Sequence, residues 1–371
     1  MTAQSEAVLV TPVAVRNFVH RTAQQRVVFG GGTRRQIAEE ARLAGITRAM
    51  VVSTEGQARR ASELAELLGD CCQLRFSRAR MHTPVPITDE AVALAAEHRI
   101  DGIVAVGGGS ATGLAKAIAL RTDAVQIVLP TTYSGSEMTD IVGQTADGVK
   151  QTTRDPKVLP EVIVYDVELT STLPALVSVT SGANALAHAL EGLYAENGNP
   201  LIALIAEEGI RALASALPRF SQVLDDMEAR SEALYGAWLC GSVLGATSMA
   251  LHHKLCHVLG GTFDLPHAET HAALLPHTIA YNAPAAPAAM ARAARALGAD
   301  DVPSRLFDLV RGRGAPASLR ALGLPGDALG RATEMALRNP YWNPRPLERD
   351  GIRALLDDAW HGRRPESTTT S

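Results

Sequence analysis

The sequence is poor in several features that mark particular classes of protein. Aromatic residues make up 4% of its 371 residues, and it has four cysteines with no Cys-x-x-Cys pair. The chain therefore has no disulfide framework, and we expect its cysteines to be small buried apolar residues of a reduced protein. Uncharged apolar runs of about 18 residues, which a membrane-spanning helix needs, are missing. The first residues, MTAQSEAVLVTPVAV, lack the pattern of a signal peptide, so we expect a cytoplasmic protein with no membrane partner.

An excess of positive charge is missing as well. The chain has 35 Lys and Arg against 39 Asp and Glu, whereas a nucleic-acid-binding domain normally carries a basic stripe, so we predict no nucleic-acid partner. Five arginines cluster between Arg16 and Arg35, and we interpret them as a solvated face. Hydrophobic residues at 46% against 20% charged residues are typical of a globular protein, and the length favours two domains.

Strand-like and helical patterns alternate through the first half of the chain. This alternation predicts a mainly parallel sheet that helices cover on both faces. After residue 170 long Ala- and Leu-rich helical patterns follow, so we expect an α/β domain over 1–168 and a helical domain over 169–371. Strands are expected at 26–33, 48–54, 101–110, 124–137 and 158–169, and helices at 34–45, 56–70, 88–100 (opened by a Thr88–Asp89 cap) and 111–122.

A glycine-rich turn ends the strand expected at 101–110. Gly107, Gly108, Gly109 and Ser110 stand where this buried strand becomes a helix, and ligands of open α/β sheets bind at the carboxyl ends of the strands. Glycines there let backbone N–H groups approach a phosphate, and the helix N-terminus adds a positive dipole. The spacing matches neither Gly-x-Gly-x-x-Gly nor a P-loop, so a phosphate cradle and an ordinary tight turn both remain open.

A loop rich in hydroxyl groups follows the next expected strand. The segment 130–140 offers Thr131, Thr132, Ser134 and Ser136, whose hydroxyls suit ribose and phosphate oxygens. Two adjacent loops of N–H and O–H donors favour a nucleotide over a bare phosphate, and the alternative is a polar surface loop. Another glycine run, 30–32, we interpret mainly as a turn.

Histidines cluster in the second half of the chain, where six of the eleven lie within residues 252–277. A spacing of four residues places several of them on one helix face. Three imidazoles and an oxygen side chain can form a metal site, but an asparagine is a neutral and poor ligand for a transition metal. The pattern predicts a functional pocket and leaves open whether it binds metal. The candidates are Asn184 with His188, His253 with His257, and then His267, His271 and His277.

Together these motifs resemble the iron-containing alcohol dehydrogenase superfamily, and most closely its maleylacetate reductase branch. The shared elements are GGGS with Lys116 six residues after its serine, the PTT loop, a helix with ligand positions four residues apart, and His253-x3-His257 followed by Pro-His267. Branch features are Gly113 in place of the usual aspartate, the short PTTYSGSE loop, HHKLCHVLGGTFDLPHAETHA and NPYWNPRP. The resemblance covers nearly the whole chain.

The resemblance implies a Rossmann-like dinucleotide-binding domain followed by an all-α domain, the dehydroquinate synthase-like architecture of this superfamily. The site would lie in the cleft between the domains of a homodimer. The implied reaction is reduction of the C=C bond of maleylacetate, and of chloromaleylacetates, to 3-oxoadipate by NADH or NADPH in aromatic compound degradation. Because this bond is conjugated to a ketone, hydride addition leaves an enolate that hydrogen-bond donors or an imidazolium can hold without a metal.

The resemblance also implies roles for single residues. His257 is expected beside the nicotinamide, while His253 and His188 polarise the substrate ketone or supply the proton. A substrate carboxylate calls for cationic partners, since arginine suits bidentate pairing, although a surface salt bridge of the arginine is equally open. The expected carboxylate partners are Tyr341, Arg345 and Lys254.

The end of the second strand bears on the choice of cofactor. This strand ends in Ser53 and Thr54, with Glu55 next and Arg59 and Arg60 nearby. A carboxylate at this place holds the ribose 2′-OH and disfavours NADP, so we expect NADH with tolerance of NADPH. No metal is expected, because an asparagine stands among the superfamily's metal positions. These positions are Asn184, His188, His253 and His267, and the expected cofactor contacts are Gly108, Gly109, Ser110, Thr131, Thr132, Ser134 and Lys150.

Three other functions remain open on the sequence. A metal-dependent alcohol or aldehyde dehydrogenase of the same superfamily would lose activity on chelation and would turn over simple aldehydes. A lyase on the dehydroquinate synthase-type scaffold would consume no net NADH, and its Lys- and Arg-rich phosphate pocket is not apparent. A non-catalytic binding protein would not need intact GGGS, PTT and histidine motifs.

Overall fold

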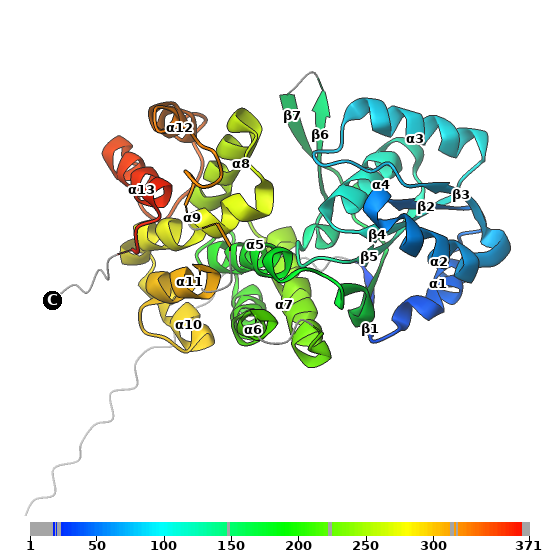
Figure 1. Cartoon of the computed structure of the whole chain (residues 1–371), viewed down its shortest axis with the longest axis horizontal. Coiled ribbons are helices and arrows are strands. Elements are labelled where there is room, and N and C mark those ends of the chain that lie inside the picture. Colours follow the sequence, from blue (N-terminus) through cyan, green and yellow to red (C-terminus); the bar gives the residue numbers. More distant parts are fainter. Residues whose placement is uncertain are drawn as a thin grey trace, which may run out of the picture.

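A computed structural model describes residues 18, 20, 24–146, 149–221, 225–311, 315–316 and 318–365. In this part of the chain, six parallel strands form one sheet in the order β1-β8-β5-β4-β2-β3 (Figure 1). The predicted parallel α/β fold followed by a helical region is confirmed. The strands are β1 Arg26–Gly30, β2 Ala49–Ser53, β3 Cys72–Phe76, β4 Gly102–Gly107, β5 Val125–Pro130 and β8 Val162–Asp166.

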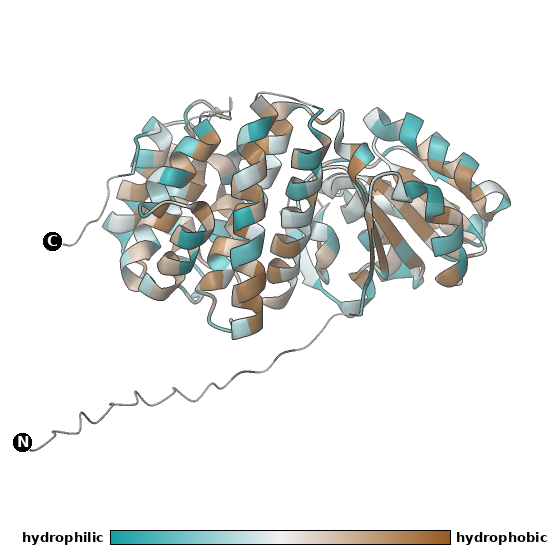
Figure 2. Cartoon of the chain, turned by 90° about the horizontal axis from the view of Figure 1, so that it is seen from below, coloured by the Kyte–Doolittle hydropathy of each residue, from teal (hydrophilic) through white to brown (hydrophobic). Residues whose placement is uncertain are grey.

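Helices cover both faces of this sheet. They are α1 Ile37–Leu43, α2 Ala58–Leu68, α3 Val85–Glu97 and α4 Gly109–Thr122. Met50 and Val52 of β2 pack into the cluster that contains buried residues of α3 and α4, whereas Ala49 and Val51 pack with those of α1 and α2. Successive strand residues point to opposite faces, so both sets of helices bury apolar side chains of the same strand. Figure 2 shows these strands in brown between helices that carry teal residues.

Three local features differ from the expectation. Helix α3 begins at Val85, three residues before the expected start at Thr88, because Pro84 and Pro86 have backbone conformations suited to a helix start. Thr88 therefore lies inside the first turn, where its hydroxyl donates to the Pro84 carbonyl, and it does not cap the helix. Strand β3 at the sheet edge had no predicted counterpart. A second sheet, the antiparallel hairpin of β6 (Ile141–Ala146) and β7 (Val149–Arg154), was also not predicted, since its mixed polar residues lack an apolar face.

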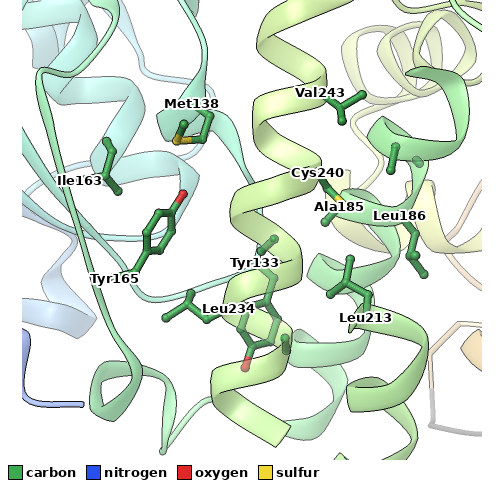
Figure 3. Close-up of a cluster of buried hydrophobic side chains, with 14 of the residues drawn as sticks. Tyr133, Met138, Ile163, Tyr165, Ala185, Leu186, Leu213, Leu234, Cys240 and Val243 are labelled. Atoms are coloured by element: carbon green, nitrogen blue, oxygen red, sulfur yellow. The ribbon is translucent and has the colours of Figure 1, made fainter. Parts of the chain in front are cut away.

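The remainder of the described chain is helical. Its helices are α5 Ala175–Leu193, α6 Pro200–Ala216, α7 Met227–Ala246, α8 Leu251–Phe263, α9 His267–Asn282, α10 Pro287–Leu297, α11 Val302–Arg311, α12 Ala328–Ala336 and α13 Arg349–His361. One apolar cluster joins this region to the sheet, with Tyr165 of β8 and Met138 near Leu234 and Cys240 of α7 (Figure 3). The two regions thus share a packed core, and the division at residue 168 stays a prediction.

A buried arginine strengthens this junction. Arg230 of α7 donates to Ser178 Oγ at 2.7 Å and to the Leu173 carbonyl at 2.8 Å, and its guanidinium lies over the Phe220 ring. It also reaches the Tyr133 hydroxyl, which belongs to the loop after β5. The loop that carries the predicted cofactor contacts is therefore tied to the helical region.

Other expectations have mixed outcomes. Cys240 and Cys256 are buried as expected, whereas Cys71 and Cys72 are half-buried. The arginine cluster is not a purely solvated face: Arg34 is largely buried and pairs with the fully buried Asp166 over 2.8 Å, while Arg16 and Arg21 lie outside the described residues. No single described helix is long and apolar enough to cross a membrane; α7 and α8 meet the criterion only as a pair, bent by 95°.

Candidate active site

Two loops meet at the carboxyl ends of the neighbouring strands β4 and β5. The Thr131 N–H donates to the Gly107 carbonyl at 3.0 Å and joins the two loops directly. A Cβ atom on Gly108 would lie 2.8 Å from Thr132 Oγ1, so this approach requires glycine. The structure therefore brings the predicted glycine turn and the hydroxyl-rich loop together.

The start of α4 next to these loops suits an anion. No side chain caps this helix, Gly109 is exposed and Ser110 is half-buried, so the first N–H groups can meet a phosphate. Strands β2 and β4 are neighbours in the sheet, but the chain runs from β2 to β3 on one side and from β4 to β5 on the other side. Dinucleotides bind at such a reversal of strand order in open α/β sheets. Thr132 and Ser134 are half-buried, whereas Thr131 is buried. These residues fit a nicotinamide dinucleotide; the side chain of Lys150 lies outside the described part.

Lys116 of α4 holds the hydroxyl-rich loop through hydrogen bonds to its backbone. Its Nζ donates to the carbonyls of Ser136 and Thr139, both at 2.6 Å, and to that of Ile141 at 3.0 Å. The side chain is 1% exposed, and burial lowers the pKa of Lys116 to about 7 while Glu137 and Asp140 oppose the shift. This motif residue thus anchors the backbone that follows Ser134.

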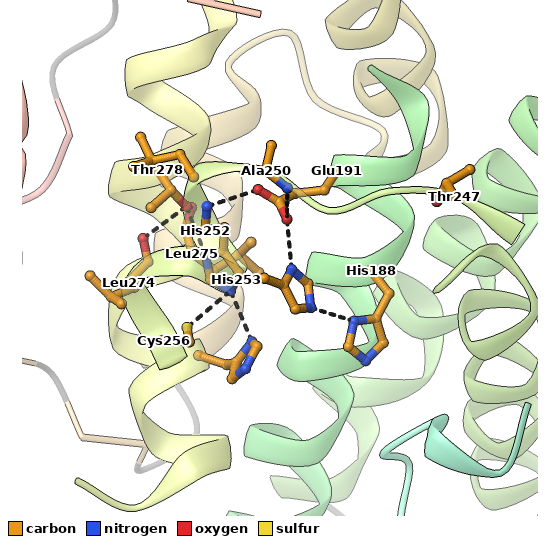
Figure 4. A network of polar contacts seen from close by, with 12 residues as sticks. His188, Glu191, Thr247, Ala250, His252, His253, Cys256, Leu274, Leu275 and Thr278 are labelled. Atoms are coloured by element: carbon orange, nitrogen blue, oxygen red, sulfur yellow. Dashed lines mark hydrogen bonds and ion pairs between the residues drawn. The ribbon is translucent and has the colours of Figure 1, made fainter. Parts of the chain in front are cut away.

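The histidines gather where α5, α8 and α9 meet. His188 Nδ1 of α5 lies 2.8 Å from His253 Nε2 of α8, and their rings stack with centroids 4.9 Å apart. The other nitrogen of His188 is 3.2 Å from the Ser134 carbonyl. The other nitrogen of His253 is 2.6 Å from Glu191 Oε2, as Figure 4 shows. We call His188 and His253 the carboxylate-anchored pair.

Glu191 was not among the predicted site residues. It lies on α5, three residues after His188, and its side chain is fully buried. Besides His253, its carboxylate accepts the backbone N–H groups of Ala250 at 3.0 Å and His252 at 2.8 Å, at the start of α8. It therefore fixes both the His253 ring and the helix that carries it. The spacing His-x-x-Glu, which puts both side chains on one helix face, was the available signal.

The partners of the carboxylate-anchored pair determine its protons. The Ser134 carbonyl can only accept, so His188 Nε2 carries hydrogen. The Glu191 carboxylate accepts two backbone N–H groups and also the Nδ1 hydrogen of His253. The 2.8 Å contact between the two remaining nitrogens needs a third proton. Burial and neighbouring His253 lower the pKa of His188. With three hydrogens on two rings, the pair as a unit carries one positive charge opposite Glu191.

A second pair lies beside the first, and we call His252 and His271 the hydroxyl-anchored pair. His252 Nε2 lies 2.9 Å from His271 Nδ1, and His252 Nδ1 is 2.9 Å from Thr278 Oγ1. Thr278 itself donates to a helix carbonyl, so it accepts from His252. His271 Nε2 is buried without a partner. Two protons satisfy these contacts, and burial lowers the pKa of both rings, so this pair is neutral.

The remaining predicted histidines surround these pairs. The exposed His257 ring lies 6.4 Å from that of His253, and the half-buried His267 ring lies 4.5 Å from that of His271. His277 lies farther along α9, against Phe307.

The superfamily's metal position carries an amide where an acidic ligand is usual. Asn184 lies one helical turn before His188, and its Oδ1 is buried without a partner. This amide and three imidazoles provide no negative charge. The absence of a metal requirement therefore stays a prediction.

The C-terminal segment NPYWNPRP lies against α8 and α9. Asn343 accepts the Leu251 N–H at 3.3 Å, which ties the segment to the start of α8. Tyr341 Oη is buried without a partner, burial raises the pKa of Tyr341, and Lys254 Nζ lies 5.5 Å from the centre of its ring. Arg345 donates to the Tyr281 carbonyl at 3.0 Å and stacks on the Tyr281 ring, so its role as a carboxylate partner stays a prediction.

Known proteins match this chain over most of its length. The family model for iron-containing alcohol dehydrogenase matches residues 24–167, and that for the Fe-containing alcohol dehydrogenase family, C-terminal, matches residues 178–360. The maleylacetate reductase of Sphingobium indicum is 55% identical over 94% of this chain and 99% of its own length, and that of a Rhizobium species is 54% identical with the same coverage.

Solved structures agree with these matches. The crystal structure of maleylacetate reductase from Agrobacterium tumefaciens superposes with a TM-score of 0.92 at 54% identity, and the match covers 95% of this chain and 100% of that one. The chain therefore belongs to the iron-containing alcohol dehydrogenase family, in the group that contains the maleylacetate reductases.

Proposed function

We propose that this protein reduces the C=C bond of maleylacetate to give 3-oxoadipate, with a nicotinamide cofactor as hydride donor. The observation that carries this proposal is the 55% identity to the maleylacetate reductase of Sphingobium indicum over 94% of the chain. The substrate would come from ring cleavage of aromatic compounds, and chloromaleylacetates are further candidate substrates.

The reaction places charge at one atom of the substrate. When bound, the nicotinamide supplies a hydride to the alkene carbon β to the ketone, and the displaced electron pair moves to the ketone oxygen as an enolate. One proton then adds to the carbon next to the ketone, so that NADH, a proton and maleylacetate give NAD⁺ and 3-oxoadipate. The site must stabilise an enolate oxygen and deliver one proton.

The carboxylate-anchored pair has the properties that this chemistry needs. It carries a positive charge in a largely water-free site, with His188 3% and His253 7% exposed. A cation there stabilises the enolate oxygen and can supply the proton. We assign both roles to His253 and His188 as one unit, with Glu191 as the residue that positions His253.

Substrate binding is assigned to buried polar groups that have no hydrogen-bond partner among the described residues. Buried polar atoms are nearly always hydrogen-bonded, so Tyr341 Oη and Asn184 Oδ1 are candidates for substrate contacts. Lys254, over the Tyr341 ring, brings the positive charge that a carboxylate needs. Arg345 is kept as the partner of the second carboxylate.

The cofactor is proposed to lie along the two loops at β4 and β5. The α4 N-terminus at Gly109 and Ser110 would hold the pyrophosphate, with hydroxyls from the loop that contains Thr132 and Ser134. The exposed Glu55, which follows β2, favours NADH over NADPH because its carboxylate would repel a 2′-phosphate. His257 is assigned to the nicotinamide side of the site.

The decisive experiment follows nicotinamide oxidation with maleylacetate and with a panel of simple aldehydes, each with and without a chelator. We expect turnover of maleylacetate alone, unaffected by the chelator, since no step is assigned to a metal. Aldehyde turnover that the chelator abolishes would instead favour a metal-dependent alcohol dehydrogenase, the activity that the family name suggests. Absence of any nicotinamide oxidation would reject both.

We further propose a homodimeric, cytoplasmic enzyme with no nucleic-acid or membrane partner. The net charge of −4 supports the absence of a nucleic-acid partner. Light scattering of the purified protein tests the oligomeric state, and a monomer at assay concentration would contradict the proposal.

A further inference from the structure

A second group of possible metal ligands lies beside the site, on residues that the proposed reaction does not use. His252 and Cys256 are four residues apart on α8, so both side chains lie on one helix face, and His271 approaches them from α9. Donor atoms of the three residues all lie within 4.8 Å of one another. His252 and His271 are 0% exposed and Cys256 is 1% exposed.

We propose that His252, Cys256 and His271 form a binding site for a zinc ion, separate from the superfamily's metal position. One thiolate and two imidazoles are ligands that zinc prefers, and magnesium and calcium disfavour them. The Cys256 Sγ lies 3.6 Å from His252 Nε2. This separation matches the spacing of two ligands around one tetrahedral zinc, since Zn–S and Zn–N bonds are about 2.3 and 2.0 Å long.

The hydroxyl-anchored pair is prepared for such a ligand role. Thr278 accepts the Nδ1 hydrogen of His252 and so leaves the Nε2 lone pair facing Cys256, as the outer partners of metal-bound histidines do. On binding, the Cys256 thiol would release its proton to solvent. The proton between the rings would move to His271 Nε2, which has no hydrogen-bond partner among the described residues.

The charge around these residues also favours a cation. A thiolate neutralises one of the two positive charges of zinc, and the Glu191 carboxylate, which accepts the backbone N–H of His252, adds negative charge beside the group.

The first test uses the wild-type protein and does not depend on folding of a variant. Metal-free protein is titrated with Zn²⁺ against a chromophoric chelator, and with Co²⁺ while the absorption spectrum is recorded. We expect one zinc per chain and, with cobalt, the near-ultraviolet charge-transfer band of a thiolate ligand together with visible bands of tetrahedral cobalt. A wild-type protein that takes up no zinc, or whose cobalt complex lacks the thiolate band, would overturn the proposal.

Variants then locate the ion. C256S and H271N should each lose the bound zinc, and C256S should lose the thiolate band. C240S is the matched control, because Cys240 is equally buried but lies on α7 in the apolar core, and it should retain one zinc per chain. Retention of zinc in C256S with its loss in H188N would place the ion at the superfamily's metal position and reject this site.

The proposal does not depend on the proposed function. The titration reports metal uptake whether or not maleylacetate is reduced. If chelation removes zinc and leaves maleylacetate turnover unchanged, the ion has no part in the reaction, as the assignment of the two histidine pairs requires.

Discussion

Two histidine pairs lie next to each other in this site, with nearly equal N···N distances of 2.8 and 2.9 Å and similar burial, yet they differ in charge. In the carboxylate-anchored pair, the two outer ring nitrogens face acceptors, the Ser134 carbonyl and the Glu191 carboxylate. These two contacts and the contact between the rings each need a proton, so the two rings share three. The hydroxyl-anchored pair ends on Thr278 at one side and on an unpartnered nitrogen at the other, so two protons suffice. The end partners, rather than the histidines themselves, distinguish the pair to which we assign proton donation from the pair to which we assign zinc.

Neighbouring residues of one helix take part in both pairs. His252 and His253 differ by about 100° around α8, so their rings point toward different helices, and the ring centroids are 5.4 Å apart. His253 faces α5 and Glu191, while His252 faces α9 and Thr278. A single dipeptide thus supplies a cationic group and a neutral one.

The largest expected effect comes from truncating one ring in each pair. His253→Ala should lower kcat by about 10²- to 10⁴-fold with little change in KM, since it removes a group that acts in the transition state. His271→Ala leaves a comparable cavity without removing the charge, so its kcat should fall far less. Steady-state kinetics with maleylacetate compares the two. A variant of His253 that raised KM and kept kcat would rule out its catalytic role.

The next effect separates the two anchors. Glu191→Gln keeps the shape of the side chain but removes the negative charge, so the His188–His253 proton loses its counter-charge and kcat should fall about 10- to 100-fold. The free energy of unfolding should fall by about 1–3 kcal/mol as the start of α8 loses hydrogen bonds to a carboxylate. Thr278→Val, the matched change at the other anchor, should reduce stability and leave kcat almost unchanged. A larger loss of kcat in Thr278→Val than in Glu191→Gln would contradict the assignment of the positive charge to the carboxylate-anchored pair.

A third experiment tests the connection of the carboxylate-anchored pair to Lys116 through the hydroxyl-rich loop. The Ser134 carbonyl binds His188, and Lys116 fixes the backbone just after Ser134. Lys116→Met leaves several buried carbonyls without a donor, so the free energy of unfolding should fall by about 2–3 kcal/mol. Cofactor affinity, measured by quenching of protein fluorescence, should weaken several-fold because the hydroxyl-rich loop shifts. Unchanged affinity in a folded variant would show that the loop does not need this anchor.

The sequence indicated the elements of this site but not their pairing. Runs such as 102–107 are apolar throughout, because both faces of a parallel strand are buried, and they were predicted correctly. The histidine positions were also visible from their helical spacing. Which nitrogen faces which partner depends on how closely α5, α8 and α9 approach, and helical spacing alone carries no information on that distance.

Residues that act through contacts distant in sequence were missed for the same reason. In the sequence Glu191 is indistinguishable from an ordinary helix residue. Its role depends on hydrogen bonds to Ala250 and His253 of the α8 region, which lie about 60 residues away along the chain. Arg230 is similar, since its hydrogen bonds to Ser178 and Tyr133 connect three separate segments. The hairpin of β6 and β7 was missed because its strands lack the apolar alternation that marks a half-buried sheet.

The smallest expected effect concerns a histidine outside both pairs. His277 is 5% exposed and packs edge-on against Phe307, and burial lowers its pKa from 6.5 to about 4. Between these two values the unfolded chain binds a proton at His277 and the folded protein does not, so stability falls as the pH falls below 6.5. Between about pH 7.5 and 5.5 this residue should cost about 1.4 kcal/mol of unfolding free energy.

His277→Leu isolates this contribution, because leucine fills a similar volume and does not titrate. Urea unfolding of both proteins across the same pH range gives the difference in slope. The wild type should lose about 1.4 kcal/mol more than the variant, while buried histidines of the two pairs affect both proteins equally. Parallel curves would mean that folding leaves the pKa of His277 unchanged. NMR of the ring nitrogens would then measure directly the neutral state of buried rings on which the comparison of the two pairs rests.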